Sequence, residues 1–172
     1  MVDAVAPTPV VAAGGIADGR GMAAALALGA AGVWLGTRFL ASEEAGAHPF
    51  YKEMLLQAKE TDTFYSCLFD MVWPDAPHRT LRNSTINNWE AAGRPPTGQR
   101  PGEGEVIAHQ ADGRPVVRYS ASAYAGVTGE VEAMALWAGQ GVGLVTRIQP
   151  AAEIVRELAE EAERVLRQLA ST

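Results

Sequence analysis

The first forty residues alternate between short apolar runs and a segment of small residues. Residues 10–13 (VVAA) form a continuous apolar run that closes on Gly14 and Gly15. Residues 32–35 (GVWL) form a second run that closes on Gly36 and Thr37. A continuous rather than alternating apolar run is typical of a strand buried on both faces of a parallel sheet. The pattern therefore predicts two short buried strands, each ending at a glycine.

A helix is predicted between these two strands. Asp18 is placed to cap its first turn by accepting hydrogen bonds from amides two or three residues further on, and Gly29 is placed to end it. Its apolar contacts are predicted at Met22, Ala23, Leu26 and Leu28. A strand–helix–strand crossover of this kind belongs to a parallel sheet and is right-handed.

Further along the chain, four segments have clear patterns. Residues 42–58 and 131–138 are predicted to be helical, and the second of these precedes the glycine-rich stretch GQGVG. Residues 91–104 hold four glycines and three prolines, which predicts a loop. The last helix is predicted to begin near Pro150 and to run to about Leu169. Its apolar residues form one stripe, so it is expected to pack against another element.

Composition narrows the class of protein. The 172 residues are 48% hydrophobic, which is enough to bury a core. Lys and Arg total 14 against 20 Asp and Glu, and this net charge of −6 gives no general attraction for nucleic acid or for an anionic membrane. No apolar run is long enough to span a bilayer, and no basic segment precedes the first run, so a cytoplasmic protein is expected. The single cysteine, Cys67, excludes an intrachain disulfide and is expected to be an ordinary core or partly buried thiol.

The paired glycine steps suggest a site for a phosphate. Several backbone amides bind a phosphate dianion well, and the chain approaches closely enough only where no Cβ intervenes. Gly14, Gly15 and Gly36 meet that condition, Thr37 adds a hydroxyl donor, and the start of the following helix is expected to add its positive dipole end. The alternative is that these glycines only permit tight turns and close packing. The phosphate is expected to contact backbone amides rather than Lys or Arg side chains. Arg38 is the nearest cation in sequence and could equally pair with Glu43 or Glu44.

Three longer segments of the chain resemble a known protein family. The run AAGGIADGRGMAAALALGAAGVWLGTRFLASEEAGAHPFYKE is similar to the carboxyl-terminal barrel segment of the nitronate monooxygenases, also called 2-nitropropane dioxygenases. The later segments EVEAMALWAGQGVGLV and PAAEIVREL resemble the carboxyl-terminal helices of the same family. The resemblance implies a TIM-type barrel that binds FMN non-covalently. By the motif match, the phosphate of FMN would be lined by Gly14, Gly15, Trp34, Leu35, Gly36 and Thr37.

The resemblance also defines the expected fold and domains. The fold class is α/β, with the chain forming the carboxyl-terminal part of a TIM-type (β/α)8 barrel, its last two strands, plus a mostly helical carboxyl-terminal subdomain. The expected division is residues 1–41 for the two barrel units, residues 42–149 for a segment that covers the pocket, and residues 150–172 for the final helix. Members of the family carry six further strands and an active-site histidine in a His-Ala/Glu-Gly-Gly type of motif, which these 172 residues lack.

No catalytic residue is assigned. The three histidines, His48, His78 and His109, are each expected to have a surface or structural role, and their scatter argues against a metal site. Residues 65–89 could contact the substrate. Phe69, Trp73 and Trp89 there would either cover an apolar substrate or, as the favoured reading, form a core. Gln140 resembles a position near the flavin in relatives.

The leading functional hypothesis is FMN-dependent oxidation of an alkyl nitronate by molecular oxygen, with this chain as part of a fuller enzyme and inactive alone. The DMVWPDAPHR stretch modestly favours it over a flavin-dependent enoyl-acyl-carrier-protein reductase, which would need a nicotinamide donor. A third hypothesis is a non-catalytic fragment or partner half. Because two strands leave open sheet edges, self-association or a chain that supplies the missing strands is also expected.

Overall fold

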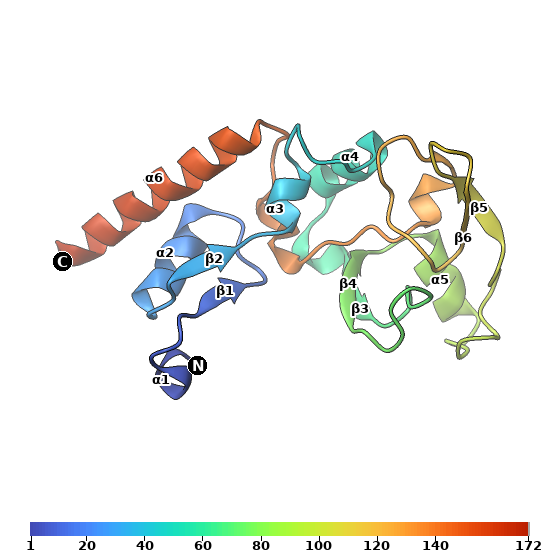
Figure 1. Cartoon of the computed structure of the whole chain (residues 1–172), viewed down its shortest axis with the longest axis horizontal. Helices are drawn as coiled ribbons and strands as arrows, with labels where there is room; N and C mark the ends of the chain where they lie inside the picture. Colours follow the sequence, from blue (N-terminus) through green and yellow to red (C-terminus); the bar gives the residue numbers. More distant parts are fainter. Residues whose placement is uncertain (172) are drawn as a thin grey trace. The chain divides into compact units, whose positions relative to one another are not determined.

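The computed structural model describes residues 1–171 and divides the chain into two compact units (Figure 1). The first unit comprises residues 1–45 and the chain from Gly139 onward, and the second comprises residues 46–138. The expected segments ran differently, with boundaries after residue 41 and before residue 150. Residues 139–149 instead belong with the two strand–helix units and the final helix.

The first unit contains the predicted strand–helix–strand crossover. Strand β1 (Val11–Ala13) pairs in parallel with β2 (Gly32–Trp34), and helix α2 (Gly19–Ala27) connects them. The Asp18 carboxylate accepts a hydrogen bond of 2.9 Å from the amide of Gly21, which confirms the predicted cap. Gly29, with φ of +90°, follows the helix end. The unit also holds α1 (Val2–Val5), α3 (Thr37–Leu40), a 3₁₀ turn η3 (Gln140–Leu144) and α6 (Ala151–Ala170).

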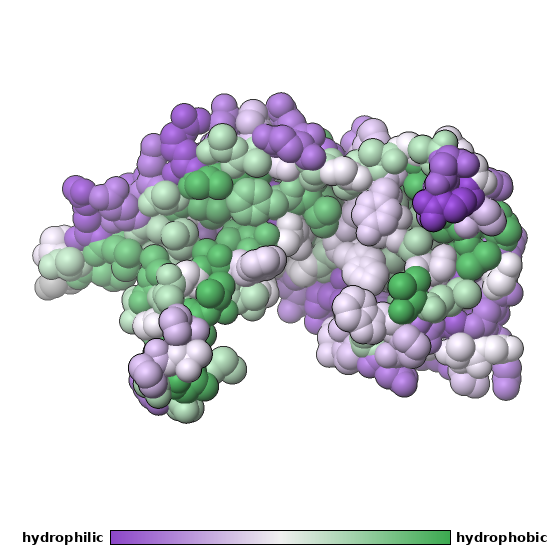
Figure 2. All heavy atoms as spheres, in the orientation of Figure 1, coloured by the Kyte–Doolittle hydropathy of each residue, from purple (hydrophilic) through white to green (hydrophobic). Residues whose placement is uncertain are grey.

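The two strands are not buried on both faces, so that prediction is wrong for this structure. The side chain of Val11 is 55% exposed and that of Trp34 is 73% exposed. Among residues 1–171 this sheet has only two strands, and α2 is the crossover that packs on it. In Figure 2 hydrophobic atoms gather over β1, β2 and α2, whereas the outer side of α6 is hydrophilic.

Helix α6 packs on α2, as its apolar stripe predicted. Ile154, Leu158 and Ala162 are buried along that stripe, and Ala23 is buried on α2. The two helices lie close together at Gly19, where an added Cβ would lie 2.5 Å from the Cβ of Glu161. Only a glycine permits this approach, so the first turn of α2 is fitted to α6.

The second unit is mixed rather than mostly helical, which corrects the expected fold. It holds two small antiparallel sheets, one of β3 and β4 and one in the order β6-β5-β7. Their strands are β3 (Thr63–Ser66), β4 (His78–Leu81), β5 (Val106–His109), β6 (Pro115–Val117) and β7 (Thr128–Gly129). The helical elements are α4 (Pro49–Gln57), α5 (Ser84–Ala91), η1 (Glu60–Asp62) and η2 (Val131–Ala133).

Two predicted helices differ from the structure. In the 42–58 segment the helix begins only at Pro49, because His48 is extended and its ring Nδ1 caps the amide of Phe50. In the 131–138 segment only the 3₁₀ turn η2 forms, and the chain then extends. There the carbonyl of Leu136 accepts from the amide of Leu81, and the amide of Ala138 donates to the carbonyl of Arg79. These bonds to β4 replace helical ones, so tertiary pairing overrides local helix propensity.

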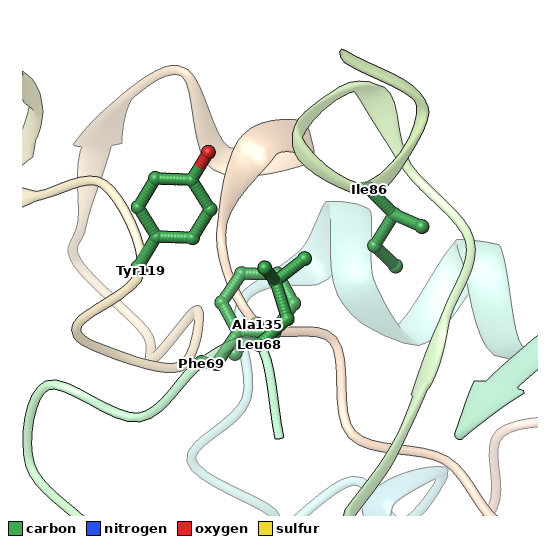
Figure 3. Close-up of a cluster of buried hydrophobic side chains, with 5 residues drawn as sticks. All are labelled: Leu68, Phe69, Ile86, Tyr119 and Ala135. Carbon is green, nitrogen blue, oxygen red and sulfur yellow. The ribbon is translucent and has the colours of Figure 1, made fainter. Parts of the chain in front are cut away.

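A cluster of buried apolar side chains forms the core of the second unit (Figure 3). Its members come from four separate parts of the sequence: Leu68, Phe69, Ile86, Tyr119 and Ala135. Phe69 is therefore a core residue, as favoured, and Trp89 packs half-buried against the cluster. Trp73 is 75% exposed and belongs to no core. Cys67 is also exposed, contrary to expectation. The predicted loop over residues 91–104 holds no helix or strand after α5 ends.

Candidate functional site

The carboxyl ends of β1 and β2 lie side by side. The register pairs Ala13 with Trp34, so the chain leaves both strands at the same edge of the sheet. Gly14 and Gly15 follow one strand, and Gly36 follows the other after a single residue. The prediction that the two glycine steps share one edge is therefore confirmed.

The turn after β1 requires glycine for its own conformation. Gly14 has φ of +93° and Gly15 has φ of +72°, and side chains rarely tolerate this left-handed region. No atom lies within 4 Å of a Cβ built on either residue. The turn thus explains both glycines without a ligand, and it also leaves their backbone open to one.

Gly36 differs, because neither conformation nor packing demands a glycine there. Its φ of −94° and ψ of −68° are accessible to any residue, and no atom lies within 4 Å of a Cβ built on it. The space in front of this backbone is therefore open, and a side chain would fill it. That arrangement fits a group that approaches the backbone at the distance of a hydrogen bond.

Thr37 is held so that its hydroxyl can donate. Its Oγ1 accepts a hydrogen bond of 3.0 Å from the amide of Gly139, which leaves the hydroxyl proton for another partner. The helix that Thr37 begins, α3, has only four residues. A helix this short adds only a small dipole, so any hydrogen bonds to an anion here would come from individual amides and from the Thr37 hydroxyl.

The first turn of α2 is not open to an anion. The amide of Gly19 donates to the Glu161 carboxylate at 2.7 Å, and the amide of Gly21 donates to Asp18. Burial alone would raise the pKa of Asp18, but the Gly21 hydrogen bond and the ion pair with Arg20 outweigh it and hold the pKa below its usual value. Two carboxylates therefore occupy the amides of Gly19 and Gly21 at this helix start.

The partners found for Arg38 are distant from it in sequence. It is only 7% exposed, and its Nη2 donates to Oε1 of Gln149 at 2.9 Å and lies 3.9 Å from the Glu157 carboxylate. Burial lowers the pKa of Arg38, and the nearby Glu157 partly offsets this. The Glu44 carboxylate instead accepts from the amide that begins α6. The side chain is thus held through Nη2, whereas Nη1 is buried and has no hydrogen-bond partner among the described residues.

Trp34 and Leu35 stand at the end of β2, directly before the second glycine step. The Trp34 side chain is 73% exposed and Leu35 is half-buried. An exposed indole at a strand end offers a flat apolar surface. The assignment of these two residues to a flavin stays a prediction.

The three histidines have partners or positions that fit structural roles. His48 caps α4, and His109 lies exposed at the end of β5. In His78, Nδ1 lies 2.9 Å from the carbonyl of Ala76, and Nε2 accepts from the amide of Phe69 at 3.3 Å. No group of three or more His, Cys, Asp and Glu side chains within residues 1–171 could hold a metal ion. Over the same residues, no helix is long and apolar enough to cross a membrane.

Two glycines that sequence reasoning did not assign also contact the glycine steps. Gly139 bonds to Thr37, and a Cβ added to Gly141 would lie 3.2 Å from the carbonyl oxygen of Gly15. The signal in the sequence was the pair of glycines around Gln140. Its meaning could not be read without knowing what the segment packs against.

Comparison with known proteins identifies the relatives of this chain. The family model described as "Nitronate monooxygenase" matches residues 1–161. A putative monooxygenase of Mycobacterium tuberculosis is 37% identical over 161 residues, which are 94% of this chain and 40% of that protein. The structure of nitroalkane oxidase from Streptomyces ansochromogenes matches with a TM-score of 0.65 and 31% identity, over 97% of this chain and 42% of that one. The structure of FabK from Thermotoga maritima matches with a TM-score of 0.64 and 30% identity, over 95% and 47%. The chain thus spans about two fifths of the length of this relative and less than half of either solved chain.

Proposed function

The chain belongs to the nitronate monooxygenase family of flavin-dependent oxidoreductases, and from that membership we propose that it forms the phosphate-binding part of an FMN site. The enzyme so formed oxidises alkyl nitronates with molecular oxygen. The proposal rests on one observation about Gly36. Its backbone conformation is accessible to other residues and an added Cβ would meet no atom, yet the residue is glycine. A ligand close to the backbone gives this position a reason to be glycine.

The donors present fit a phosphate monoester. Backbone amides at Gly14, Gly15 and Gly36 supply neutral hydrogen bonds, and Thr37 supplies a hydroxyl that accepts one hydrogen bond from Gly139 and keeps its proton to donate. The family resemblance adds Trp34 and Leu35 to this lining. A chain of net charge −6 has little general attraction for an anion, so the phosphate depends on these local dipoles.

Bound FMN would supply the redox chemistry, in which electrons pass from the nitronate to oxygen. The role of this chain is to fix the phosphate end and thereby the position of the ring. A ring whose tail is held by two adjacent loops has fewer orientations to lose when the substrate binds. No catalytic group is assigned within these residues.

We also propose that β1 and β2 are the last two strands of a TIM-type barrel. The support is the parallel pairing of β1 and β2, their strand–helix–strand order, and their exposed faces. The faces of parallel sheets are normally covered by other elements. Completion of the sheet would come from strands outside the described residues, from a partner chain or through self-association. Such strands would also cover Val11 and Trp34.

The test of the phosphate site is equilibrium binding of FMN and of riboflavin, which lacks the phosphate, to the purified chain. The proposal expects tighter binding of FMN, measured by quenching of flavin fluorescence. Equal affinity for the two flavins would contradict a phosphate-binding site at these residues. Activity is tested by oxygen uptake with propionate-3-nitronate, first with the chain alone and then with any partner that supplies further strands.

A second candidate is a flavin-dependent reductase of enoyl thioesters. The observation that keeps it is the fold likeness to FabK, which is as close as the likeness to nitroalkane oxidase. The two candidates share the phosphate site and differ in the electron donor. Consumption of NADH with an enoyl thioester, in place of oxygen uptake with a nitronate, would favour this candidate. A non-catalytic partner half would show neither activity under any combination.

A further inference from the structure

We propose that residues 139–141 act as a strut that sets the spacing between the two glycine loops and aims the Thr37 hydroxyl. The inference rests on the proposed function, in which those loops bind the phosphate of FMN. Gly139 and Gly141 are positioning residues in this arrangement, because they act through Thr37 and Gly15 rather than on the ligand.

The first contact of the strut is with the loop after β2. The amide of Gly139 donates to Oγ1 of Thr37 at 3.0 Å, across 102 positions of sequence. A threonine hydroxyl that accepts one hydrogen bond keeps its own proton free to donate in another direction. This bond therefore holds the side chain of Thr37 in place and leaves its proton available to a ligand.

The second contact is with the loop after β1. A Cβ on Gly141 would lie 3.2 Å from the carbonyl oxygen of Gly15 and 3.2 Å from the Cβ of Ala17. Contacts this short are tighter than about nine in ten real Cβ contacts, and here one neighbour is backbone, which yields less readily than a flexible side chain. Gly141 is therefore a glycine because the Gly15 loop lies directly against it.

The strut is itself anchored in the core of the first unit. Val142, the next residue, is fully buried, and Val145 is 3% exposed. The carbonyl of Gly139 accepts from the amide of Val142, and that of Val142 accepts from the amide of Val145. A segment held in this way contacts both loops from one rigid element, whereas the sheet alone fixes only where each loop begins.

Spacing matters because a binding constellation loses much of its strength when its parts are displaced by about 0.5 Å or more. The donors on the two loops must reach one phosphate together. A push on the Gly15 loop would therefore weaken the grip on phosphate and leave contacts to the flavin ring unchanged. This distinction separates a positioning role from a general loss of structure.

The experiment compares FMN with riboflavin across matched variants of the purified chain. For Gly141→Ala we expect FMN affinity to fall about tenfold, roughly the worth of one lost or strained hydrogen bond, with riboflavin affinity within about twofold of wild type. Gly32→Ala is the control, because Gly32 lies within β2 and no atom stands within 4 Å of its added Cβ. It should bind both flavins as the wild type does.

The Thr37 arm tests the first contact. Thr37→Val removes the acceptor for the Gly139 amide and should lower FMN affinity about tenfold. Thr37→Ser restores the hydroxyl and should recover most of it. A serine variant as weak as the valine variant would contradict the arrangement.

The outcomes separate the strut from the proposed function. If the wild type binds FMN no better than riboflavin, the phosphate site itself fails. The proposed strut is overturned if the wild type prefers FMN and Gly141→Ala keeps that preference. It is also overturned if Gly141→Ala weakens the binding of FMN and of riboflavin equally. A readout without ligand is the amide spectrum of the chain, in which Gly141→Ala should move the Gly15 and Ala17 resonances. Unmoved resonances would also overturn the strut.

Discussion

The backbone of Gly19 lies against the side chain of Glu161. Its amide donates to the carboxylate at 2.7 Å, and an added Cβ would lie 2.5 Å from the Glu161 Cβ and 2.7 Å from the backbone nitrogen of Ala162. This relationship joins the first turn of α2 to the middle of α6, so the packing of the two helices depends on the absence of one methyl group.

Gly19→Ala should destabilise the fold. The added methyl overlaps backbone that cannot move without separating α2 from α6, and overpacking of this kind costs about 1–3 kcal/mol. Unfolding in urea, followed by circular dichroism, measures the change. Gly32→Ala is the matched control and should leave the midpoint nearly unchanged, since its methyl meets open space. Equal urea midpoints for Gly19→Ala and Gly32→Ala would contradict this prediction, because α2 could then move away from α6 at no cost in stability.

Gly36→Val and Arg38→Ala should separate ligand affinity from stability. A Cβ at Gly36 meets no atom within 4 Å and the backbone conformation is accessible to valine, so the fold should be kept while FMN affinity falls about tenfold or more. Arg38→Ala removes a buried side chain bonded to Gln149 and should lower stability first. Titration with FMN and urea unfolding of both variants give the comparison. A larger loss of affinity in the arginine variant would reverse the assignment.

Asp18 should stabilise α2 in a pH-dependent way. Its folded-state pKa lies below the usual value, so its contribution is present above the unfolded pKa and is lost as pH falls through the folded pKa. Asp18→Ala should therefore cost about 1 kcal/mol near pH 7, as loss of an N-cap does, and less near pH 3. Asp18→Asn keeps a capping oxygen at both pH values and is the control. A cost for alanine that stays constant from pH 7 to pH 3 would contradict the charged cap.

The local parts of the first unit could be predicted from sequence because each rests on short-range chemistry. The strand runs, the Asp18 cap and the glycine turn after β1 are set by neighbouring residues and are found as predicted. The stripe of α6 likewise required a partner, and α2 provides it. The shared edge of the two glycine steps followed from the parallel crossover alone.

The remaining differences come from contacts between residues distant in sequence. Residues 134–138 have helical composition, yet the backbone pairs with β4 and is extended. Arg38 lies beside Glu43 and Glu44 in sequence but bonds to Gln149, 111 positions away. The strut residues Gly139 and Gly141 were equally hidden, because a glycine required by the packing of a distant loop carries no local pattern.

Arg100 should be the main polar support of the second unit. It is 5% exposed, donates to Asp70 at 2.7 Å and to the carbonyl of Leu68 at 2.9 Å, and pairs with Glu103. Its guanidinium also lies 4.3 Å from the ring centroid of Tyr119. Arg100→Met should destabilise by about 3 kcal/mol, because two carboxylates lose their cation.

Arg100→Lys separates charge from geometry in that network. Lysine keeps the charge but cannot reach three acceptors and the ring together, so we expect an intermediate loss of stability. Urea unfolding followed by tryptophan fluorescence reports on this unit, which contains Trp89 next to the core. A methionine variant as stable as the wild type would show that the network contributes nothing net.

The last prediction is that residues 1–172 alone do not turn over a nitronate. General acid–base catalysis contributes about 10²–10⁴-fold, and the active-site histidine motif that the family resemblance implies does not occur in these residues. His48 spends its Nδ1 on a helix cap, and both ring nitrogens of His78 have backbone partners. The rings of His48 and His78 therefore both take part in structural hydrogen bonds.

The ring of a flavin bound to this chain alone is also expected to stay in contact with solvent. The proposed donors lie on two adjacent loops at one sheet edge, so they would hold the phosphate end and would supply no contact that excludes water from the ring. Exclusion of water is part of what a closed flavin site supplies. We therefore expect FMN binding without oxygen uptake when the purified chain is assayed with propionate-3-nitronate. Turnover comparable to that of a longer relative would place a base within these residues, and His48→Ala and His78→Ala would then identify which histidine supplies it.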